Sequence, residues 1–448
     1  MKNKITLIKN ARIVNEGKII DGDILIENEY IKEIAPSISA KSADVHVFDV
    51  ENNYVLPGAI DDQVHFREPG LTHKATIATE SKAAAAGGIT SFIEMPNTNP
   101  QTTTIEKLEE KFKVASETSW VNYSFMFGGT NDNLEEILKV DSKNVAGLKL
   151  FLGSSTGNML VDNPEVLEKI FSSTDLLISV HCEDEATIRK NLKAHTDKFG
   201  DDIPIKYHPI IRSEEACYLS SSKAIELAKK TGARLHIFHL STGKETNLFT
   251  NKIPLKDKKI TAEVCIHHLW FTDKDYERKG TLIKWNPAVK TENDRAQLWK
   301  ALLDDRIDVI ATDHAPHTIE EKNNVYTKAP SGGPLVQHAF PAMLEAHHQG
   351  KISIEKIVEK MCHNPSILFQ VEKRGYIKEG YFADLVIVDL NNPWTVNKDN
   401  ILYKCGWSPF EGITFKSRIS HTFVNGSLVY KSAKFYDENA GKRLTFDR

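Results

Sequence analysis

The sequence predicts an α/β fold: a (β/α)8 TIM-like barrel with a small composite β-domain formed by the N- and C-terminal segments. Short apolar runs alternate with amphipathic helical stretches through the middle of the chain, which is typical of such a barrel. Side chains suited to metal binding stand at the ends of several of these runs. Alternating strand-like segments at both ends of the chain indicate the β-domain.

The eight apolar runs have the length and the β-branched composition of parallel strands. They cover residues 59–66, 89–95, 121–127, 146–152, 176–182, 234–240, 260–266 and 308–314. Helical stretches such as ATIATESKAAAAGG and ENDRAQLWKALLDD lie between them. Eight strands each followed by a helix favour a closed barrel, and an open doubly wound sheet is the alternative.

The two flanking segments have a different pattern. Residues 4–50 and 375–430 contain short alternating strands separated by turn residues. Neither segment is long enough to form a stable sheet alone, so we expect the two to pack together. The predicted domains are therefore a β-domain of residues 1–54 and 375–448, and a barrel of residues 55–374.

Composition and charge exclude several classes of protein. A formal net charge of −4 over 448 residues gives no basic surface for nucleic acid. The N-terminus lacks the apolar core of a signal peptide, and no run is long enough to span a membrane. Five cysteines, odd in number and far apart, indicate a reducing compartment. We expect a cytoplasmic protein with a small-molecule ligand. The protein could also form a homo-oligomer.

Barrel enzymes carry their active sites at the carboxyl ends of the strands. Five residues suited to metal binding or acid–base chemistry lie there, on five different predicted strands: His65, Lys149, His181, His239 and Asp313. A single histidine is more often a core or surface side chain, but five such residues at one end indicate a site. Imidazole and carboxylate groups bind zinc, and a carboxylate can also exchange a proton with water. His236 should face away from this site.

Lys149 is a cation in an otherwise apolar strand. A buried lysine is costly unless it is paired or chemically altered. One interpretation is a structural salt bridge. The other is reaction of the neutral amine with carbon dioxide, which gives a carbamate that can bridge two metal ions.

Substrate-binding residues are predicted beside these positions. Strand alternation places Gln63, His65 and Arg67 on one face, and Arg67 offers a planar fork for a carboxylate. Asn97 follows the second strand between two prolines, where a plain turn is the alternative. His317 is well placed to meet a negative group, and the SGGP loop at 331–334 could present backbone donors.

The ordered motifs resemble those of the amidohydrolase superfamily, and within it those of the dihydroorotases. They extend over nearly the whole chain: PGAIDDQVHFREPG, MPNTNP, GLKLF, VHCED, HIFHLST, KWNPAVK and ATDHAPHT. The resemblance implies reversible cyclisation of N-carbamoyl-L-aspartate to L-dihydroorotate plus water in pyrimidine (UMP) biosynthesis. Allantoinases, dihydropyrimidinases and a non-catalytic protein of this fold are the alternatives. Arg67 favours dihydroorotate as the substrate, because dihydroorotate carries a carboxylate on its ring, whereas allantoin and dihydropyrimidines do not.

The resemblance also implies a role for each matching residue. The metal ligands would be His65, Lys149 as a carbamate, His181, His239 and Asp313. Asp313 would also be the catalytic acid and base for a metal-activated hydroxide. The substrate contacts would be Arg67, Asn97, Asn286, His317, and the backbone of Ser331 and Gly332. The GLKLFLGSS segment is similar to the lysine-bridged (class I-like) form, which implies one or two zinc ions.

One position departs from the family pattern. The first strand of these proteins normally reads His-x-His, whereas here Gln63 precedes His65. An amide oxygen is neutral and a weaker zinc ligand than imidazole. We therefore expect the metal held by this pair to bind less tightly or to be absent.

Overall fold

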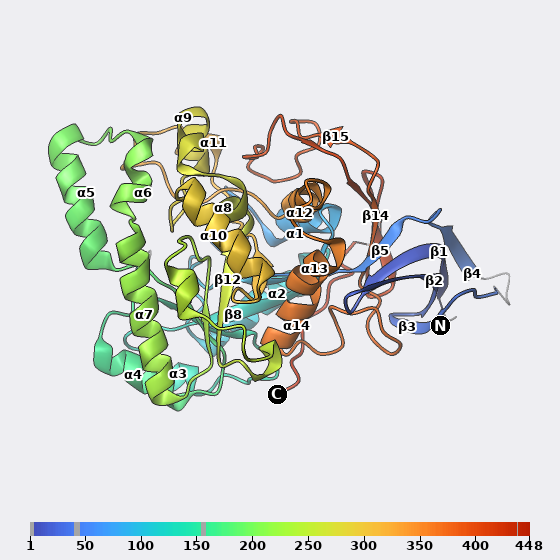
Figure 1. The fold of residues 1–448 in the computed structure, drawn as a ribbon. Helices are drawn as coiled ribbons and strands as arrows, with labels where there is room; N and C mark the ends of the chain where they lie inside the picture. Colours follow the sequence, from blue (N-terminus) through green and yellow to red (C-terminus); the bar gives the residue numbers. More distant parts are fainter. Residues whose placement is uncertain (1–3, 40–44, 154–157, 437) are drawn as a thin grey trace.

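The computed structural model describes residues 4–39, 45–153, 158–436 and 438–448. Its centre is an eight-stranded parallel sheet in the order β13-β12-β11-β10-β9-β8-β7-β6 (Figure 1). The strands are β6 (Ala59–Val64), β7 (Ile89–Glu94), β8 (Asn122–Gly128), β9 (Gly147–Phe151), β10 (Ile178–His181), β11 (Leu235–Ile237), β12 (Ile260–Cys265) and β13 (Val309–Ala311). The His65 N–H donates to the His314 carbonyl at 2.7 Å, which joins the first strand to the last. The structure therefore confirms the predicted closed barrel, and the alternative of an open doubly wound sheet is wrong.

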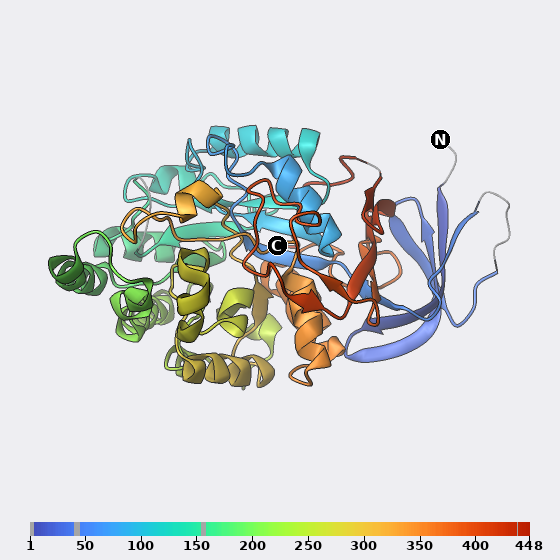
Figure 2. The same cartoon turned by 90° about the horizontal axis from the view of Figure 1, so that it is seen from above.

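Helices surround this barrel, as Figure 2 shows from above. The longer ones are α1 (Ile77–Ala86), α2 (Ile105–Thr118), α4 (Pro164–Ser173), α5 (Glu185–Phe199), α7 (Glu214–Thr231), α10 (Glu292–Leu303) and α12 (Ala339–His348). Six of these begin at a side chain that accepts a hydrogen bond from an N–H of the first turn: Thr76, Thr104, Asn163, Asp184, Ser213 and Thr291. Such caps satisfy N–H groups that have no partner within the helix, so the sequence itself fixes these helix starts.

Short helices complete the connections. They are α3 (Leu134–Ile137), α6 (His208–Ile211), α8 (Ile266–Trp270), α9 (Tyr276–Lys279), α11 (Ile319–Lys322), α13 (Ile354–Val358) and α14 (Asn364–Phe369). Between β11 and β12, where every residue is described, the chain forms only the 3-10 turns Glu245–Leu248 and Leu255–Asp257. The strict strand–helix alternation that the sequence predicted is therefore interrupted once. Pro254, which precedes the second turn, cannot continue a helix from the residues before it.

A second, nine-stranded sheet combines both ends of the chain. Its order is β19-β18-β17-β14-β5-β1-β2-β3, and β4 pairs with β1. The N-terminal strands are β1 (Ile5–Asn15), β2 (Lys18–Glu27), β3 (Tyr30–Ala35), β4 (Val45–Asp49) and β5 (Tyr54–Pro57). The C-terminal strands are β14 (Leu385–Asp389), β17 (Arg418–Val424), β18 (Ser427–Lys431) and β19 (Lys434–Phe435). Antiparallel pairing of β14 with β5 joins the two segments, as the composite β-domain requires.

The sheet and the barrel are closely connected. Only Gly58 separates β5 from β6, and a Cβ atom there would lie 2.0 Å from the Thr90 hydroxyl. At the other end, Leu444 N–H donates to the Tyr123 carbonyl at 2.9 Å, so the last residues lie along the barrel strand β8. A two-stranded pair, β15 (Trp394–Thr395) with β16 (Thr414–Phe415), lies in the same C-terminal region. The exact limits of 1–54, 375–448 and 55–374 stay a prediction.

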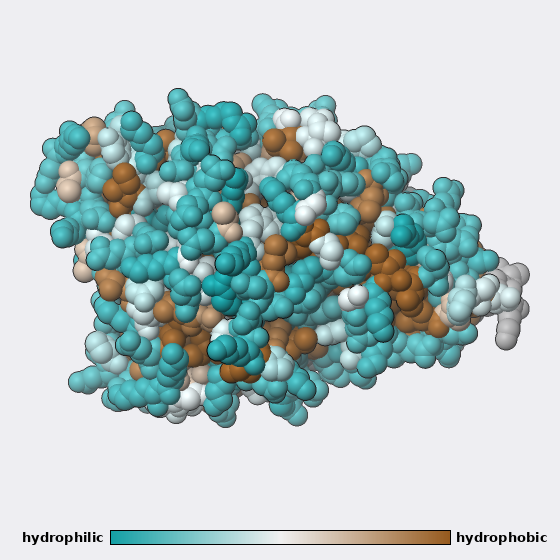
Figure 3. All heavy atoms as spheres, in the orientation of Figure 1, coloured by the Kyte–Doolittle hydropathy of each residue, from teal (hydrophilic) through white to brown (hydrophobic). Residues whose placement is uncertain are grey.

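The surface is largely hydrophilic on the face shown in Figure 3, and apolar residues gather there mainly where the β-domain meets the barrel. The apolar core lies inside the barrel and beneath its helices, with a separate cluster under the second sheet. Among the described residues, no helix combines the length and apolarity that crossing a membrane requires.

Candidate functional site

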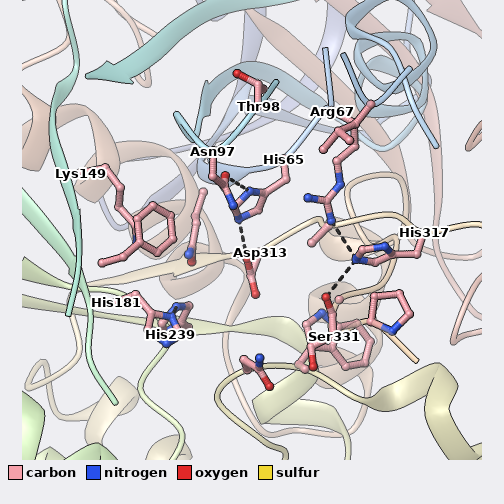
Figure 4. A pocket seen from close by; sticks show the side chains of 18 of the residues that line it. His65, Arg67, Asn97, Thr98, Lys149, His181, His239, Asp313, His317 and Ser331 are labelled. Carbon is pink, nitrogen blue, oxygen red and sulfur yellow. Dashed lines mark hydrogen bonds and ion pairs between the residues drawn. The ribbon is translucent and has the colours of Figure 1, made fainter. Parts of the chain in front are cut away.

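A cavity of about 1100 Å³ opens at the carboxyl ends of the barrel strands. The residues that the sequence singled out all line it: Gln63, His65, Arg67, Asn97, Lys149, His181, His239, Asn286, Asp313, His317, Ser331 and Gly332. Figure 4 shows most of them converging from different strands. Strand alternation and the barrel topology thus bring together residues separated by up to 269 positions, although their individual roles stay predictions.

His65 lies directly after β6 and faces Asp313. Its Nε2 is 3.2 Å from an Asp313 oxygen, and its Nδ1 is 2.8 Å from the Asn97 Oδ1 (Figure 4). An amide oxygen only accepts, so Nδ1 carries the ring proton and Nε2 presents a lone pair. Burial lowers the pKa of His65, which favours this neutral form. A lone pair facing a carboxylate is an arrangement that a cation between them would stabilise.

A second pair is formed by His181 and His239. The His181 Nδ1 lies 2.9 Å from the His239 Nε2, and the His181 Nε2 lies 3.0 Å from Glu183. Arg212 forms an ion pair with the same Glu183 carboxylate. Because the carboxylate accepts, His181 carries its proton on Nε2, and its Nδ1 lone pair faces His239. Metal-binding histidines are commonly oriented by a carboxylate in this way.

Three of these residues adopt backbone angles in the left-handed region, where side chains other than glycine are strained. Arg67, His239 and Asp313 have φ values of 69°, 42° and 47°. Such residues cluster at functional sites, where surrounding contacts must hold them. One such contact is visible, because the His239 N–H donates to the buried Glu263 carboxylate at 3.0 Å.

Lys149 lies within β9 with its Nζ buried in the cavity floor. This atom has no hydrogen-bond partner among the described residues, and the Phe238 ring centroid is 4.1 Å away. Burial lowers the pKa of Lys149 from 10.5 to about 7. A large share of the molecules then carries a neutral amine at neutral pH. Among the described residues no carboxylate pairs with the Lys149 Nζ, so the salt-bridge interpretation is not supported. The unpaired amine is compatible with the other interpretation, a carbamate.

The donor types in the cavity suit a divalent metal ion, and they form two pairs, His65 with Asp313 and His181 with His239. No three of these four side chains bring their ligand atoms within 4.8 Å of one another among the described residues. The buried His239 Nδ1 and Lys149 Nζ lack hydrogen-bond partners there. Gln63 lies in the same cavity. The Cys265 Sγ is 3.7 Å from its amide oxygen but only 3.2 Å from the Glu263 carboxylate, so the single thiol proton goes to Glu263. Ser154 and Ser155 of the GLKLFLGSS segment lie outside the described residues.

The other end of the cavity is electropositive. The Arg67 Nε donates to the Pro316 carbonyl at 3.1 Å, and its Nη2 lies 3.1 Å from the His317 Nε2. Burial lowers the pKa of Arg67 to about 10, so the guanidinium stays charged at neutral pH. Burial, followed by the charge of Arg67, holds the pKa of His317 well below its ordinary value. A buried cation of this kind requires an anion, and a carboxylate matches its shape.

The Ser331–Gly332 loop closes this end. The Ser331 carbonyl lies 3.0 Å from the His317 Nε2, and the Gly332 N–H donates to the Lys284 carbonyl at 2.8 Å. A Cβ atom on Gly332 would lie 2.5 Å from the Ala315 carbonyl oxygen, so only glycine fits there. The predicted backbone donor at Gly332 is therefore already used within the protein.

Sequence reasoning missed several residues that support the site. Glu183 follows His181 by two positions, so strand alternation could have placed it on the same face. The Lys74 contact with His317 spans 243 residues and had no local signal. The Lys322 Nζ donates to the Pro330 and Gly332 carbonyls at 2.9 and 2.7 Å, which holds the Ser331–Gly332 loop.

A further buried cluster lies apart from the cavity lining. Asp62, His236 and Glu263 place their ligand atoms within 4.8 Å of one another, a spacing that could admit a metal ion. The His236 Nε2 is 3.5 Å from Asp62 and 3.8 Å from Glu263. Burial opposes a charge on His236, but the two carboxylates outweigh it and raise its pKa to about 9. His236 is not among the residues that line the cavity, and its structural role stays a prediction.

Known proteins are similar to this chain over nearly its whole length. A sequence profile of the amidohydrolase family matches residues 54–429. The chain is 34% identical to the dihydroorotase of Halobacterium salinarum over 408 residues, which is 90% of this chain and 92% of that one. It is 33% identical to the dihydroorotase of Staphylococcus epidermidis (96% and 100% covered) and 35% identical to that of Carboxydothermus hydrogenoformans (95% and 98%).

Solved structures show the same fold. The L-hydantoinase (dihydropyrimidinase) of Arthrobacter aurescens superposes with a TM-score of 0.92 at 28% identity, covering 98% of this chain and 99% of that one. The dihydropyrimidinase of Brevibacillus agri superposes with a TM-score of 0.88 at 23% identity, covering 99% and 100%. The second likeness concerns the fold alone.

Proposed function

Because the chain belongs to the amidohydrolase family, and within it to the dihydroorotases, we propose that it interconverts N-carbamoyl-L-aspartate and L-dihydroorotate. In the biosynthetic direction the ureido nitrogen attacks the β-carboxyl group, the ring closes and water leaves. The reverse reaction is hydrolysis of a cyclic amide. The reaction would supply dihydroorotate for pyrimidine (UMP) biosynthesis.

The observation that carries this proposal is the buried Arg67. Its guanidinium lies in the cavity without a carboxylate among its hydrogen-bond partners in the described residues, beside His317 and near Asn97. Dihydroorotate brings a ring carboxylate that would complete this pair, whereas allantoin and dihydropyrimidines do not. Arg67 thus favours dihydroorotate, although the solved structures of similar fold include dihydropyrimidinases. Asn286 lines the same cavity and is proposed as a further substrate contact.

The residues that would hold zinc are His65, Asp313, His181, His239 and a carbamate on Lys149. When bound, zinc supplies Lewis acidity, which polarises a carbonyl and lowers the pKa of water towards neutrality. Imidazole and carboxylate oxygens are the ligands that zinc prefers. Gln63 offers only a neutral amide oxygen, which is a weaker zinc ligand than imidazole, and this supports one tight and one weaker metal position.

Asp313 is proposed as the acid and base of the reaction. In hydrolysis it accepts a proton from the attacking water and returns it to the ring nitrogen that leaves; in cyclisation the same transfers run in reverse. Asn97 keeps the neighbouring His65 in the tautomer whose lone pair faces Asp313, so the ring does not compete as a proton donor.

Arg67 and Asn97 are proposed to orient the substrate. In the open-chain substrate, fixing the α-carboxylate at Arg67 leaves the ureido group and the β-carboxyl group to meet near Asp313. Holding two reacting groups at close range is a large part of what such a site contributes.

Several wider expectations accompany this proposal. The five cysteines are all free, which agrees with a reducing, cytoplasmic location. The ligand is a small molecule, and a homo-oligomer stays an untested expectation.

The proposal is tested by Arg67→Met. Breaking a buried charge-assisted pair costs about 2–5 kcal/mol, so kcat/KM for dihydroorotate should fall by a factor of roughly 30 or more. Arg278→Met, which removes an exposed arginine of α9, is the matched control and should match the unaltered protein. Near-normal kinetics of Arg67→Met would show that the carboxylate is held elsewhere and would remove the main support for this substrate.

A further inference from the structure

A lysine that neither the motifs nor the proposed mechanism uses lies at the electropositive end of the cavity. Lys74 comes from the loop between β6 and α1, and its side chain is only 13% exposed. Its Nζ lies 3.0 Å from the His317 Nδ1 and 3.1 Å from Glu321. The charge of Lys74 is therefore balanced by Glu321, and its remaining contact is directed at the ring of His317.

This contact determines where His317 carries its proton. An ammonium group only donates, so the His317 Nδ1 accepts from Lys74 at 3.0 Å. The Glu321 carboxylate faces the same nitrogen at 3.6 Å, which is too far for a hydrogen bond. A neutral imidazole then has its single proton on Nε2. The Ser331 carbonyl, 3.0 Å from Nε2, accepts that proton in the free protein.

The tautomer has a consequence for Arg67. The Arg67 Nη2 lies 3.1 Å from the His317 Nε2, but a protonated Nε2 cannot accept a hydrogen bond from it. Within the described residues, the only other acceptor recorded for this guanidinium is the Pro316 carbonyl, which takes Nε. Nη2 and the Nε2–H group are then two donors side by side at the cavity wall. Two adjacent donors form a site for an anion.

Without Lys74 the opposite tautomer becomes available. If Nδ1 carried the proton, Nε2 would accept from Arg67, and the two side chains would satisfy each other. Resting on the proposed function, we infer that Lys74 is a positioning residue for substrate specificity: it holds His317 as an Nε2–H donor and so keeps the Arg67 corner open for a ring carboxylate. Lys74 acts through His317 and does not need to touch the substrate.

The experiment measures binding of orotate and of uracil to the zinc-loaded protein by calorimetry, together with kcat and KM for dihydroorotate. Orotate carries the ring carboxylate and uracil lacks it. Lys74→Met should weaken orotate binding and raise KM at least tenfold, with a smaller change in kcat and no change in uracil binding. Lys107→Met, which removes a partly exposed lysine of α2 that pairs with Glu110, is the matched control.

Two further variants test the control of the tautomer. Lys74→Arg keeps a side chain that can only donate, whereas the amide of Lys74→Gln can donate or accept and so leaves both His317 tautomers available. Lys74→Arg should bind orotate within about threefold of the unaltered protein, measured in the same way, and Lys74→Gln should bind it more weakly than Lys74→Arg does. Equal losses in Lys74→Arg and Lys74→Met, or unchanged orotate binding in Lys74→Met, would overturn the inference while leaving the proposed function intact. Failure of the unaltered protein to bind orotate or to hydrolyse dihydroorotate would overturn the proposed function, and this inference with it.

Discussion

Replacing Lys149 by methionine should stabilise the metal-free protein. The two side chains are similar in volume, but methionine removes a buried, unpaired cation. A pKa of about 7 against 10.5 corresponds to a cost of about 5 kcal/mol for the fully protonated group. At pH 7 half of the folded molecules have already lost the proton, so Lys149 lowers the free energy of unfolding by about 4 kcal/mol. Lys149→Met should raise it by this amount.

The sign of the pH dependence follows from the same shift. The folded pKa lies below the unfolded one, so the unfolded chain binds more protons between pH 7 and 10.5. The cost is therefore complete below pH 7, falls as the pH rises through this window, and disappears above it. The advantage of Lys149→Met should shrink to about 2 kcal/mol at pH 9.

Urea unfolding in EDTA and carbon dioxide-free buffer, at pH 7 and pH 9, measures both quantities. Lys111→Met is the matched control, because Lys111 is equally buried but pairs with Glu94 at 2.7 Å. Its loss leaves Glu94 uncompensated and should destabilise the protein by about 3–5 kcal/mol. A less stable Lys149→Met, or a difference that does not change with pH, would refute the view that Lys149 is an unpaired amine.

Three further predictions concern the metal site. Lys149→Ala should lose bound zinc and activity, and short carboxylic acids added to the buffer should partly restore both; full zinc occupancy in this variant, measured by elemental analysis, would exclude a bridging role. Gln63→His should raise zinc content towards two ions per chain in competition with a chelator, and two equally tight ions in the unaltered protein would show that the amide oxygen is an adequate ligand. Glu183→Gln should weaken zinc binding about 10–100-fold, because the amide no longer fixes the His181 tautomer; unchanged affinity would argue against this support.

The strand ends are the part of the molecule that the sequence predicts best. Apolar runs that alternate with helical stretches mark the eight strands. In a closed parallel barrel the carboxyl ends of all strands lie at the same end of the barrel. His65, Lys149, His181 and His239 therefore had to converge once the strands were placed correctly.

Contacts between loops were not predictable in the same way. Lys74 and His317 lie on different loops, and no periodicity relates their positions. The tautomer of His65 depends on one hydrogen bond to the Asn97 oxygen, and that of His317 on one hydrogen bond from Lys74. A pattern of residue types cannot show either bond. The engagement of the Gly332 N–H by Lys284 is likewise a result of tertiary packing.

Pairing between distant segments could be predicted only in outline. β5 pairs with β14 in the second sheet, as the expected packing of the two terminal segments requires. The residues near Leu444 lie along β8, and no local pattern relates these two segments.

The most direct test of the central claim is a substrate comparison with the unaltered, zinc-loaded protein. Hydrolysis of L-dihydroorotate, dihydrouracil and allantoin is measured under one set of conditions, together with formation of dihydroorotate from N-carbamoyl-L-aspartate. We expect turnover of dihydroorotate in both directions and essentially none of the two uncharged rings, because only dihydroorotate carries a carboxylate for the proposed pair with Arg67. A higher kcat/KM for dihydrouracil or allantoin than for dihydroorotate would contradict the assignment.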